Sequence, residues 1–506
     1  MKTFLSLLLV MLSLAGIIDA SYLTYEKLSN NIPPCSPGFQ CETVLTSKYA
    51  DIAGIPLPAY GLVFYIFVLV FASKHVLELE NPPIRFPAID ILALATTFGF
   101  FFSLYLVFIM GIVLQAWCVY CLLSALTCLL LFITTRIYLH LYYPQSMQLW
   151  KSIVQWITHF LYVHLLKKVL FRFSAESVHN SFTFFGEKIS QLAIGRFMLR
   201  SLWQYRDPKL VTIQAGISFP NKIGLAAGFD YDGHLPDATA SLGFGWHTIG
   251  TVTRHPYAGN TPPRLDRFPK SQALLVNKGL KSLGAKKIIA RLSHRTFDIP
   301  VGISIASTNK HFSSTKEQIL DILETFQLFE DAIMSHSYYE LNISCPNTFG
   351  GEPFTTPERL EVLLNAIDKL KLSRPVFIKM PIDQSEKETL SLLQVCDAHT
   401  LAGVIFGNLT KDKENPAVVP EERELWKQRK GNLGGKPTFE RSLKLIKLTK
   451  KHFKNRFIIV GTGGIFTTKD AQQKLKAGAD LLQMITGMIY EGPQQIGLIN
   501  RELATN

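Results

Sequence analysis

The sequence predicts a multi-domain chain with two structural parts: an all-α bundle of four transmembrane helices and an α/β barrel of the TIM, or (β/α)8, type. Four apolar stretches in the first part have nearly the length that a membrane span requires. Eight short apolar runs alternate with helical stretches in the second part, which is typical of a parallel sheet closed into a barrel. Between the two parts lies a basic, aromatic segment with the composition of helices that lie on a bilayer.

The boundaries of these parts follow from the distribution of apolar and charged residues along the 506 residues. We place the transmembrane part at residues 1–145, the membrane-docking helices at 146–200 and the barrel at 201–506. Residues 1–145 hold 6 Lys and Arg against 7 Asp and Glu, so the excess behind the net charge of +13 lies in the remainder. That remainder should favour an anionic membrane surface or acidic substrates. It carries no recognisable reader motif, so nucleic acid is not an expected partner.

The four predicted spans cover about residues 4–23, 57–73, 89–113 and 115–135. The first could be mistaken for a signal peptide, but Asp19 interrupts its end and no small-residue cleavage pattern is clear. Because three more spans follow, we expect a retained helix.

The predicted docking segment is most basic over residues 151–200, where 7 Lys and Arg stand against 2 Glu among aromatic and leucine residues. This pattern favours a helical segment on a bilayer. An ordinary amphipathic helix packed on its own domain is the alternative.

Basic residues beside the spans predict the orientation of the chain. Those on the side of the barrel are Lys2, Lys74, Arg85 and Arg136, and those on the other side are Lys27 and Lys48. The positive-inside rule then places the barrel in the cytoplasm and the loop of residues 24–56 outside. We expect a multi-pass protein of a bacterial inner (plasma) membrane, with the cysteines of the first part on its outer face, where disulfides persist.

Those cysteines form two pairs. Cys118 and Cys121 make a C-x-x-C at the start of the fourth span, where helix N–H groups stabilise a thiolate. Cys35 and Cys41 lie in the loop on the same face, so thiol–disulfide exchange could pass electrons between the pairs. Two structural disulfides are the alternative. Cys128 has no partner in this scheme and is expected to serve packing.

Residues 1 to about 140 resemble a bacterial vitamin K epoxide reductase homologue. The similarity is carried by Ala20-Ser21-Tyr22-Leu23-Thr24, by Cys35 and Cys41 six apart, by Ser47, and by Cys118-Val119-Tyr120-Cys121. The resemblance implies that Cys118 and Cys121 reduce a quinone and that Cys35 and Cys41 re-oxidise a periplasmic thioredoxin-like partner. It also implies that Ser47 helps to shape the quinone site.

The eight predicted strands are separated by helical stretches. They cover Lys222–Ala227, His247–Thr251, Pro300–Ala306, Tyr338–Ser344, Pro375–Met380, Ala402–Phe406, Phe457–Gly461 and Asp480–Ile485. In such a barrel the chemistry lies just after the strands.

Glycine and polar residues gather after these strands. Gly461-Thr462-Gly463-Gly464 and Thr486-Gly487 follow the last two strands, where backbone N–H groups bind phosphate, so a phosphate-bearing cofactor is expected. Lys379 ends the fifth strand among apolar residues, which favours a site over a solvated face. The fixed polar groups that a planar substrate needs are Asn342, Cys345, Asn347 and Asn408.

Residues 162 to 495 resemble dihydroorotate dehydrogenase. The motifs are Gly224–Asp230, Gly250–Thr253, Gly259–Arg264, Asn342–Asn347, Phe377–Met380 and Ile489–Pro493. Lys168–Phe173, Glu176 and His179 are similar to the membrane-docking extension of the quinone-dependent class. That class oxidises dihydroorotate with FMN, in pyrimidine biosynthesis, and passes the electrons to a membrane quinone.

The resemblance implies a role for each matching residue. Cys345 occupies the position of the base that removes the C5 proton, and Lys379 that of the residue that stabilises the reduced flavin. The pyrimidine ring would be held by Asn342, Asn347 and Asn408. FMN would be contacted by Ala227, Thr251, Asn342, Lys379, Gly435, Gly464 and Thr486, and Arg267 falls where the quinone passage meets the flavin. A buried inert thiol is the alternative for Cys345.

Four departures from the family pattern concern the substrate. The base position is Cys345, as in the soluble class, where the quinone-dependent class has Ser. Tyr231 stands where the family has a Lys that pairs with the orotate carboxylate. Val276 falls on a substrate asparagine, with Asn277 one residue late as the candidate replacement, and Lys278 beside it could supply the missing charge. Ser304 and Leu409 replace a usual Asn and a usual Thr or Ser.

The sequence therefore predicts a bifunctional membrane oxidoreductase in which both parts deliver electrons to quinone. A second interpretation gives the FMN barrel another reduced heterocycle or enone as substrate. A third makes the barrel a silent scaffold for the thiol oxidase. Tyr231 and Val276 favour the second interpretation slightly, and Cys345, Lys379 and the phosphate turns argue against the third.

Overall fold

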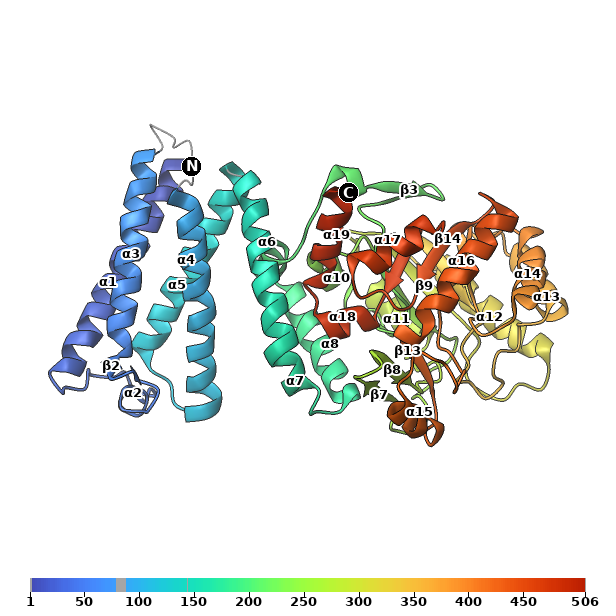
Figure 1. Cartoon of the computed structure of the whole chain (residues 1–506), viewed down its shortest axis with the longest axis horizontal. Helices are drawn as coiled ribbons and strands as arrows, with labels where there is room; N and C mark the ends of the chain where they lie inside the picture. Colours follow the sequence, from blue (N-terminus) through green and yellow to red (C-terminus); the bar gives the residue numbers. More distant parts are fainter. Residues whose placement is uncertain (1, 79–87, 143, 506) are drawn as a thin grey trace. The chain divides into compact units, whose positions relative to one another are not determined.

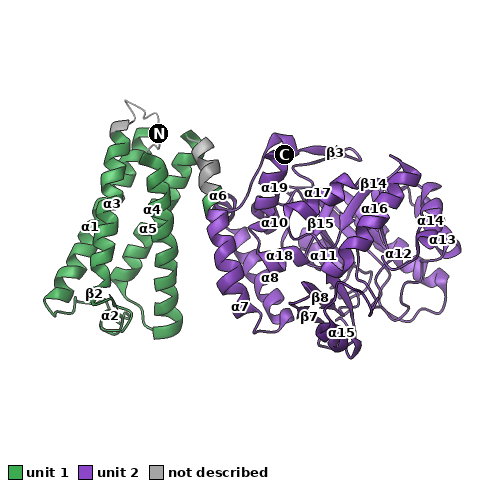
Figure 2. Cartoon of the chain, viewed as in Figure 1, with its two compact units in different colours: residues 1–153 green, residues 154–506 purple. Residues whose placement is uncertain are grey.

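The computed structural model describes residues 2–78, 88–142 and 144–505, and Arg85 of the predicted flanking charges lies outside them (Figure 1). The chain divides into two compact units, residues 1–153 and 154–506 (Figure 2). The first holds the predicted spans, and the second holds the barrel together with most of the helical segment that precedes it.

The first unit is a bundle of long helices, and its four candidate membrane spans confirm the prediction. They are α1 (Lys2–Leu28), α3 (Leu57–Glu78), α4 (Ala88–Phe108) and α5 (Val119–Tyr142). A π-helical turn, Ile109–Leu114, continues α4. The long loop between α1 and α3 carries the short helix α2 (Cys41–Leu45) and the strands β1 (Asp51–Ile52) and β2 (Ile55–Pro56).

Small residues and one buried cation set the packing of this bundle. Gly16 of α1 lies against the Tyr65 ring of α3, and a Cβ there would overlap the ring, so close approach requires glycine. Arg136, which we expected at a membrane edge, is instead fully buried inside the bundle. Its guanidinium donates to the carbonyl of Ala93, at 3.2 Å, and to the Thr97 hydroxyl of α4, because a buried charge needs such partners.

Helices precede the barrel, as predicted for residues 146–200. They are α6 (Pro144–Leu161), the π-helical Tyr162–Leu166, α7 (Lys167–Leu170), α8 (Ala175–Gln191) and α9 (Ala193–Leu202). The Ser174 hydroxyl caps α8 by accepting from the backbone N–H of Ser177. Large apolar side chains are exposed along this segment, among them Trp156, Phe160 and Phe184.

All eight predicted strands form one closed parallel barrel, in chain order around the ring. They are β5 (Ile223–Leu225), β6 (Trp246–Val252), β9 (Val301–Ile305), β10 (Tyr338–Asn342), β11 (Val376–Met380), β12 (Gly403–Phe406), β14 (Ile458–Thr462) and β15 (Leu481–Met484). Each differs from its predicted range by one or two residues at one or both ends. The strands are buried and mostly apolar because helices cover them outside and side chains fill them inside.

Most of the remaining helices surround the barrel, while Trp426 of α15 (Pro420–Lys427) packs against residues of a small antiparallel sheet (Figure 1). The remaining helices are α10 (Pro236–Leu242), α11 (Ala285–Leu292), α12 (Thr315–Glu330), α13 (Pro357–Asp368), α14 (Glu386–Asp397), α15, α16 (Phe439–Phe453), α17 (Thr468–Lys476), α18 (Thr486–Glu491) and α19 (Gln495–Thr505). An antiparallel sheet of β7 (Leu265–Phe268), β8 (Ala273–Val276) and β13 (Asn432–Gly435) carries several of the predicted site residues, and a hairpin joins β3 (Thr212–Gln214) to β4 (Ile217–Phe219).

Candidate active sites

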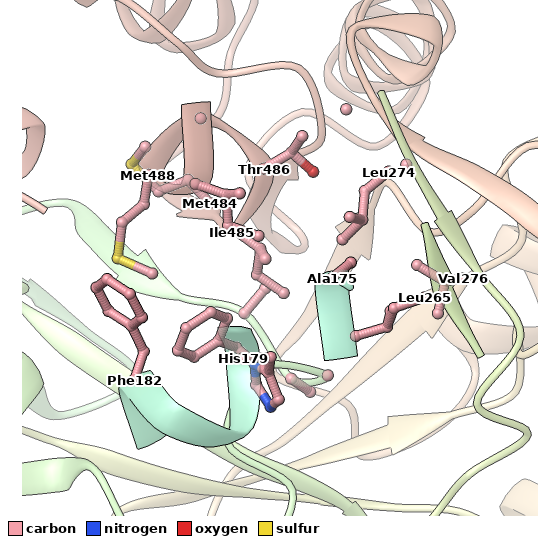
Figure 3. A pocket seen from close by; sticks show the side chains of 18 of the residues that line it. Ala175, His179, Phe182, Leu265, Leu274, Val276, Met484, Ile485, Thr486 and Met488 are labelled. Atoms are coloured by element: carbon pink, nitrogen blue, oxygen red, sulfur yellow. The ribbon is translucent and has the colours of Figure 1, made fainter. Parts of the chain in front are cut away.

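A single cavity of about 680 Å³ joins the carboxyl ends of the barrel strands to the helices that precede the barrel. It is lined by residues at or just after the carboxyl ends of β5, β6, β10, β11, β12, β14 and β15, by β7 and β8, and by α8. Figure 3 shows His179 and Phe182 of α8 facing Met484, Ile485 and Met488 across it. The predicted residues that line it are Ala227, Thr251, Arg267, Asn342, Cys345, Asn347, Lys379, Asn408, Gly435, Gly464 and Thr486.

Glycine turns form one end of this cavity. Gly435, Gly463 and Gly464 have φ of +97°, +88° and +70°. At Gly435 a Cβ would lie 2.6 Å from the Gln272 carbonyl and 2.8 Å from Thr486 Cγ2, so no side chain fits. Turns of this kind present backbone N–H groups to a phosphate.

A buried lysine lies directly behind these turns. Lys474 of α17 is fully buried, and its ammonium group donates to Ser442 Oγ at 2.8 Å and to the Thr462 carbonyl at 3.3 Å. Burial lowers the pKa of Lys474 to about 7. No carboxylate forms an ion pair with it among the residues that the structure describes. A phosphate bound at the turns would supply its counter-charge, so this end of the cavity fits a phosphorylated cofactor.

Amides and hydroxyls form a connected network deeper in the cavity. Asn342 Nδ2 donates to Thr251 Oγ1 at 2.8 Å, and that hydroxyl is 2.9 Å from Ser304 Oγ. Ser304, which replaces a usual Asn, therefore supports Thr251 from the neighbouring strand. Asn408 Nδ2 donates to the Ser344 carbonyl at 2.7 Å. These bonds fix the planar groups that would face a flat ligand.

Lys379 lies beside a buried carboxyl that the sequence reasoning missed. Burial lowers the pKa of Lys379, and the nearby Glu340 opposes that shift. Glu340 Oε1 accepts from Thr248 Oγ1 at 2.7 Å and from Gln483 Nε2 at 2.5 Å inside the barrel. A single charged residue inside the apolar strand β10 was the signal that could have revealed it.

Cys345 lines the same cavity after β10. Burial raises the pKa of its thiol to about 11, while a backbone bond with Asn347 partly opposes the shift. Asn347 Nδ2 donates to the Val276 carbonyl at 3.0 Å, and its side-chain oxygen accepts from Asn432 at 2.8 Å. Cys345 is therefore a protonated thiol at neutral pH in this cavity.

Two of the departures from the family pattern, at Tyr231 and Val276, lie in the cavity wall. Tyr231, Val276 and Lys278 line the cavity, and the Lys278 ammonium lies 5.3 Å from the centre of the Tyr231 ring. Lys278 also donates to Glu176 Oε1 of α8 at 2.6 Å. Asn277 does not line the cavity, because its side-chain oxygen turns away to accept from Asn260 Nδ2 at 3.0 Å.

The part of the cavity nearest α8 is an apolar channel (Figure 3). Its walls include Leu170, Phe171, Val178, Phe182, Phe185, Ile189, Leu265, Leu274, Met484 and Met488. Arg267 lies with its guanidinium 4.6 Å from the centre of the Phe171 ring and donates to the Phe173 carbonyl at 2.9 Å. Burial lowers the pKa of His179 to about 4, so this imidazole is neutral at pH 7.

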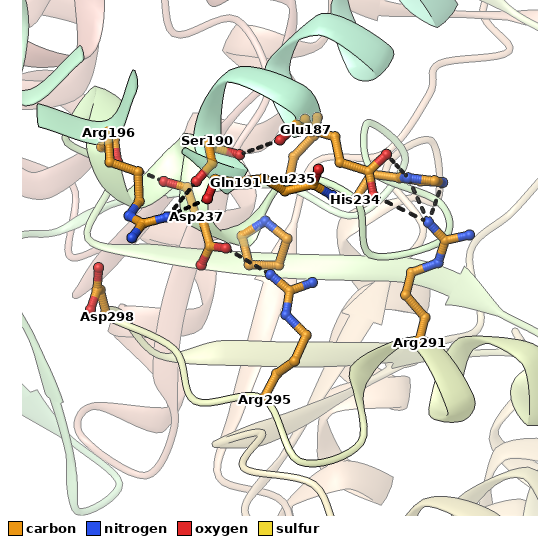
Figure 4. Close-up of polar contacts among 12 residues, drawn as sticks. Glu187, Ser190, Gln191, Arg196, His234, Leu235, Asp237, Arg291, Arg295 and Asp298 are labelled. Atoms are coloured by element: carbon orange, nitrogen blue, oxygen red, sulfur yellow. Dashed lines mark hydrogen bonds and ion pairs between the residues drawn. The ribbon is translucent and has the colours of Figure 1, made fainter. Parts of the chain in front are cut away.

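Polar contacts hold α8 and α9 against the barrel (Figure 4). Glu187 Oε2 lies 2.9 Å from His234 Nδ1, and Arg291 contacts the same imidazole at 2.6 Å. Arg196 Nη1 donates to the Ser190 carbonyl at 2.7 Å and closes the corner between α8 and α9. These contacts position the helices that wall the channel.

The cysteines of the first unit gather at one end of the bundle, as predicted. Cys35 and Cys41 form a disulfide with their Cα atoms 5.9 Å apart, and Cys118 and Cys121 are free thiols. Cys41 and Cys118 are both buried in one cluster, and the backbone N–H of Gln40 donates to the Trp117 carbonyl at 2.8 Å. The two pairs are thus adjacent, which disulfide exchange requires.

Two further residues of this unit have clear local roles. The Ser47 hydroxyl donates to the Val44 carbonyl at 2.8 Å and accepts from the backbone N–H of Tyr49 at 3.3 Å. Cys128 is buried 3.3 Å from the Tyr65 hydroxyl. Ser47 therefore shapes the end of α2, and Cys128 packs inside the bundle.

Comparisons with known proteins match both units. Residues 209–506 match the dihydroorotate dehydrogenase family, and residues 7–136 match the vitamin K epoxide reductase family. The chain is 35% identical over 319 residues to a dihydroorotate dehydrogenase (quinone) of Synechococcus sp. (strain JA-2-3B'a(2-13)), which spans 60% of this chain and 82% of that protein. It is also 35% identical over 364 residues to one of Chloroflexus aurantiacus (strain ATCC 29366 / DSM 635 / J-10-fl), spanning 68% and 96%.

A solved structure agrees in fold. The crystal structure of DHODH from Eimeria tenella in complex with ferulenol has a TM-score of 0.58 at 23% identity, covering 66% of this chain and 92% of that one. At this identity the agreement concerns the fold alone.

The raised pKa of Cys345 predicts how its reactivity depends on pH. Iodoacetamide alkylates thiolates, so labelling of Cys345 should be slow at pH 7 and rise about tenfold for each pH unit up to about pH 10. Peptide mass spectrometry after timed labelling measures the rate, with the fully buried Cys396 as internal control. A rate that levels off below pH 9 would contradict the assigned protonation state.

Proposed function

The chain belongs to the dihydroorotate dehydrogenase family and carries a vitamin K epoxide reductase domain ahead of its barrel, and from this premise we propose that the barrel oxidises dihydroorotate to orotate with FMN and a membrane quinone. The observation that carries the proposal is the cavity of about 680 Å³ in the second unit. It joins phosphate-type turns, a buried Cys and Lys, and an apolar channel walled by α8. The chain is an oxidoreductase by family, and the details below are our proposal.

The cavity offers a place for each part of FMN. Gly435, Gly464 and Thr486 would hold the phosphate, with the Lys474 charge behind them. The flavin ring would lie against Ala227, Thr251, Asn342 and Lys379. When bound, FMN supplies the acceptor for a hydride.

Cys345 would act as the base that removes the C5 proton of dihydroorotate. Its thiol must lose a proton first, and the nearby Lys379 favours the thiolate. Asn342, Asn347 and Asn408 would orient the pyrimidine ring, because each amide is already fixed by a hydrogen bond. Asn277 would act only indirectly, through Asn260.

Lys278 would bind the substrate carboxylate in place of the lysine that Tyr231 replaces. Its ammonium group is at the cavity wall and rests on the Tyr231 ring. A charge-assisted bond of this kind contributes on the order of 1.5 to 3 kcal/mol, enough to replace the missing contact.

The apolar channel would admit the quinone from the bilayer, with Arg267 where the channel reaches the flavin. Exposed apolar side chains such as Trp156, Phe160 and Phe184 support the assignment of residues 146–200 as membrane-docking helices ahead of a barrel domain at 201–506. We place the barrel in the cytoplasm of a bacterium, beneath the plasma membrane.

The first unit, residues 1–145, would pass electrons from thiols to quinone and so support disulfide formation. Cys35 and Cys41 would oxidise a periplasmic thioredoxin-like partner, and Cys118 and Cys121 would receive those electrons and reduce the quinone, with Ser47 near its site. The shared cluster of Cys41 and Cys118 supports this order. Since both units would reduce quinone, we propose that they feed one quinone pool in parallel.

A second candidate substrate is another reduced heterocycle or enone. Tyr231 and Val276 favour it, because neither supplies the polar contact that the family uses at that position. Anaerobic bleaching of the flavin by dihydroorotate distinguishes the two candidate substrates.

Dihydroorotate should bleach the flavin of the purified chain. We expect the visible absorbance of the oxidised flavin to be lost under anaerobic conditions, because the flavin accepts a hydride from the substrate. Cys345→Ala is the matched control and should slow bleaching by about 10² to 10⁴, the usual contribution of a positioned base. A flavin that dihydroorotate leaves oxidised would sink the proposed substrate.

Lys474→Met should weaken binding of FMN without weakening binding of riboflavin. The lost charge acts only on the phosphate, so the Kd for FMN should rise about ten- to a hundredfold. Quenching of flavin fluorescence on addition to the apoprotein measures both ligands. An equal loss of affinity for FMN and for riboflavin would show that Lys474 has only a structural role.

Cys118→Ala should leave reoxidation of the flavin by soluble quinone unchanged, within about twofold, because parallel pathways do not share the thiol. Stopped-flow absorbance of the pre-reduced flavin measures the rate, and thiol oxidation by the same variant should be lost. Abolished flavin reoxidation would overturn the parallel arrangement.

A further inference from the structure

A cluster of three charged side chains lies where α8 meets the cavity wall. Glu176, in the first turn of α8, accepts from Lys278 at 2.6 Å and from Arg264 Nε at 3.0 Å on the same oxygen. Lys278 is 4% exposed, Glu176 17% and Arg264 20%, so all three are largely shielded from water. The cluster holds two cations and one anion, which leaves one positive charge to be balanced.

The three members do not share one position relative to the cavity. Lys278 lines it, while Glu176 and Arg264 lie behind the wall, where Arg264 Nη1 also donates to the Ala258 carbonyl at 2.7 Å. Glu176 thus has a second cation that does not depend on the cavity. Lys278 alone can exchange partners between Glu176 and a ligand.

The two aromatic rings beside Lys278 add no charge of their own, while Lys281 and Arg264 act on it as further cations. The Tyr231 ring lies 5.3 Å from its ammonium group, and the His179 ring lies 5.8 Å from the Tyr231 ring. His179 is neutral at pH 7, because burial lowers its pKa to about 4. An anion entering the cavity therefore meets Lys278 as the exchangeable cation of this wall.

We propose that Glu176 is a resident counter-ion of the carboxylate site: an anionic substrate takes Lys278 from Glu176, which then remains paired with Arg264. Glu176 is a positioning residue that sets the affinity for the anion, and the proposal rests on the proposed substrate. A neutral ligand gains nothing from this exchange, so the cluster selects for a carboxylate.

The exchange also links the substrate to the channel. Glu176 begins α8, and Ala175, Val178, His179 and Phe182 of the same helix wall the channel (Figure 3). When Lys278 turns to a ligand, the first turn of α8 loses one of its two ionic contacts with the barrel. Occupancy of the carboxylate site thereby changes how firmly the channel wall is held.

The test compares orotate with uracil, which has the same ring without the carboxylate. Binding is followed by the change in flavin absorbance of the full-length holoenzyme in detergent. Glu176→Gln should lower the Kd for orotate by about fivefold or more and leave that for uracil unchanged. Lys278→Met should raise the Kd for orotate, and in that background Glu176→Gln should have no further effect.

Glu187→Gln is the matched control, because Glu187 lies on the same helix and pairs with His234 and Arg291 away from the cavity. It should leave binding of orotate unchanged. If Glu176→Gln does not retain flavin, Glu176→Asp provides a second variant, in which the shortened contact should tighten orotate by a smaller factor.

The outcomes separate this inference from the proposed function. If the wild type binds orotate tightly and Glu176→Gln leaves the Kd for orotate unchanged or raises it, the role of Glu176 is overturned. The proposed substrate is not affected by that result. A wild type that neither binds orotate nor is bleached by dihydroorotate overturns both.

Discussion

The second unit depends on how its buried lysine side chains are compensated within a largely apolar interior. A buried ammonium is costly unless an anion or hydrogen-bond acceptors replace the water that it loses. Lys379 has Glu340 nearby and Lys278 pairs with Glu176. Lys474 donates to a hydroxyl and a carbonyl, and Asp470 and Glu440 act on its charge without a direct ion pair among the described residues. Lys278 and Lys379 line the cavity and are therefore positioned to receive further negative charge from a ligand.

This distribution of charge divides the cavity by polarity. Glycine turns and Lys474 define a phosphate end, fixed amides around Lys379 and Cys345 define a ring site, and the channel beside α8 is apolar. An anionic substrate and an apolar acceptor would therefore reach one cofactor from environments that suit each of them. The requirement in the first unit is different. Disulfide exchange there needs only that the two cysteine pairs lie close together at one end of a helix bundle.

Features with a strong local pattern could be predicted from the sequence. The four spans and eight strands follow from apolar runs of characteristic length, and the gathering of the cysteines follows because two spans, an even number, lie between the two pairs. Side-chain partners from distant elements could not be predicted in this way. Arg136 was expected at a membrane edge and is buried, because the Thr97 hydroxyl and the Ala93 carbonyl accept hydrogen bonds from its guanidinium. The network of Glu340, Thr248 and Gln483 joins three strands of the closed barrel, so no single segment reveals it.

The balance of products in a single anaerobic reaction tests whether oxidation of dihydroorotate is coupled to reduction of quinone. The full-length protein in detergent is mixed with dihydroorotate and a soluble quinone, and orotate and quinol are measured together. We expect one orotate formed for each quinol, in the wild type and equally in Cys118→Ala. Quinone that stays oxidised while no orotate appears, in protein that retains its flavin, would contradict this expectation.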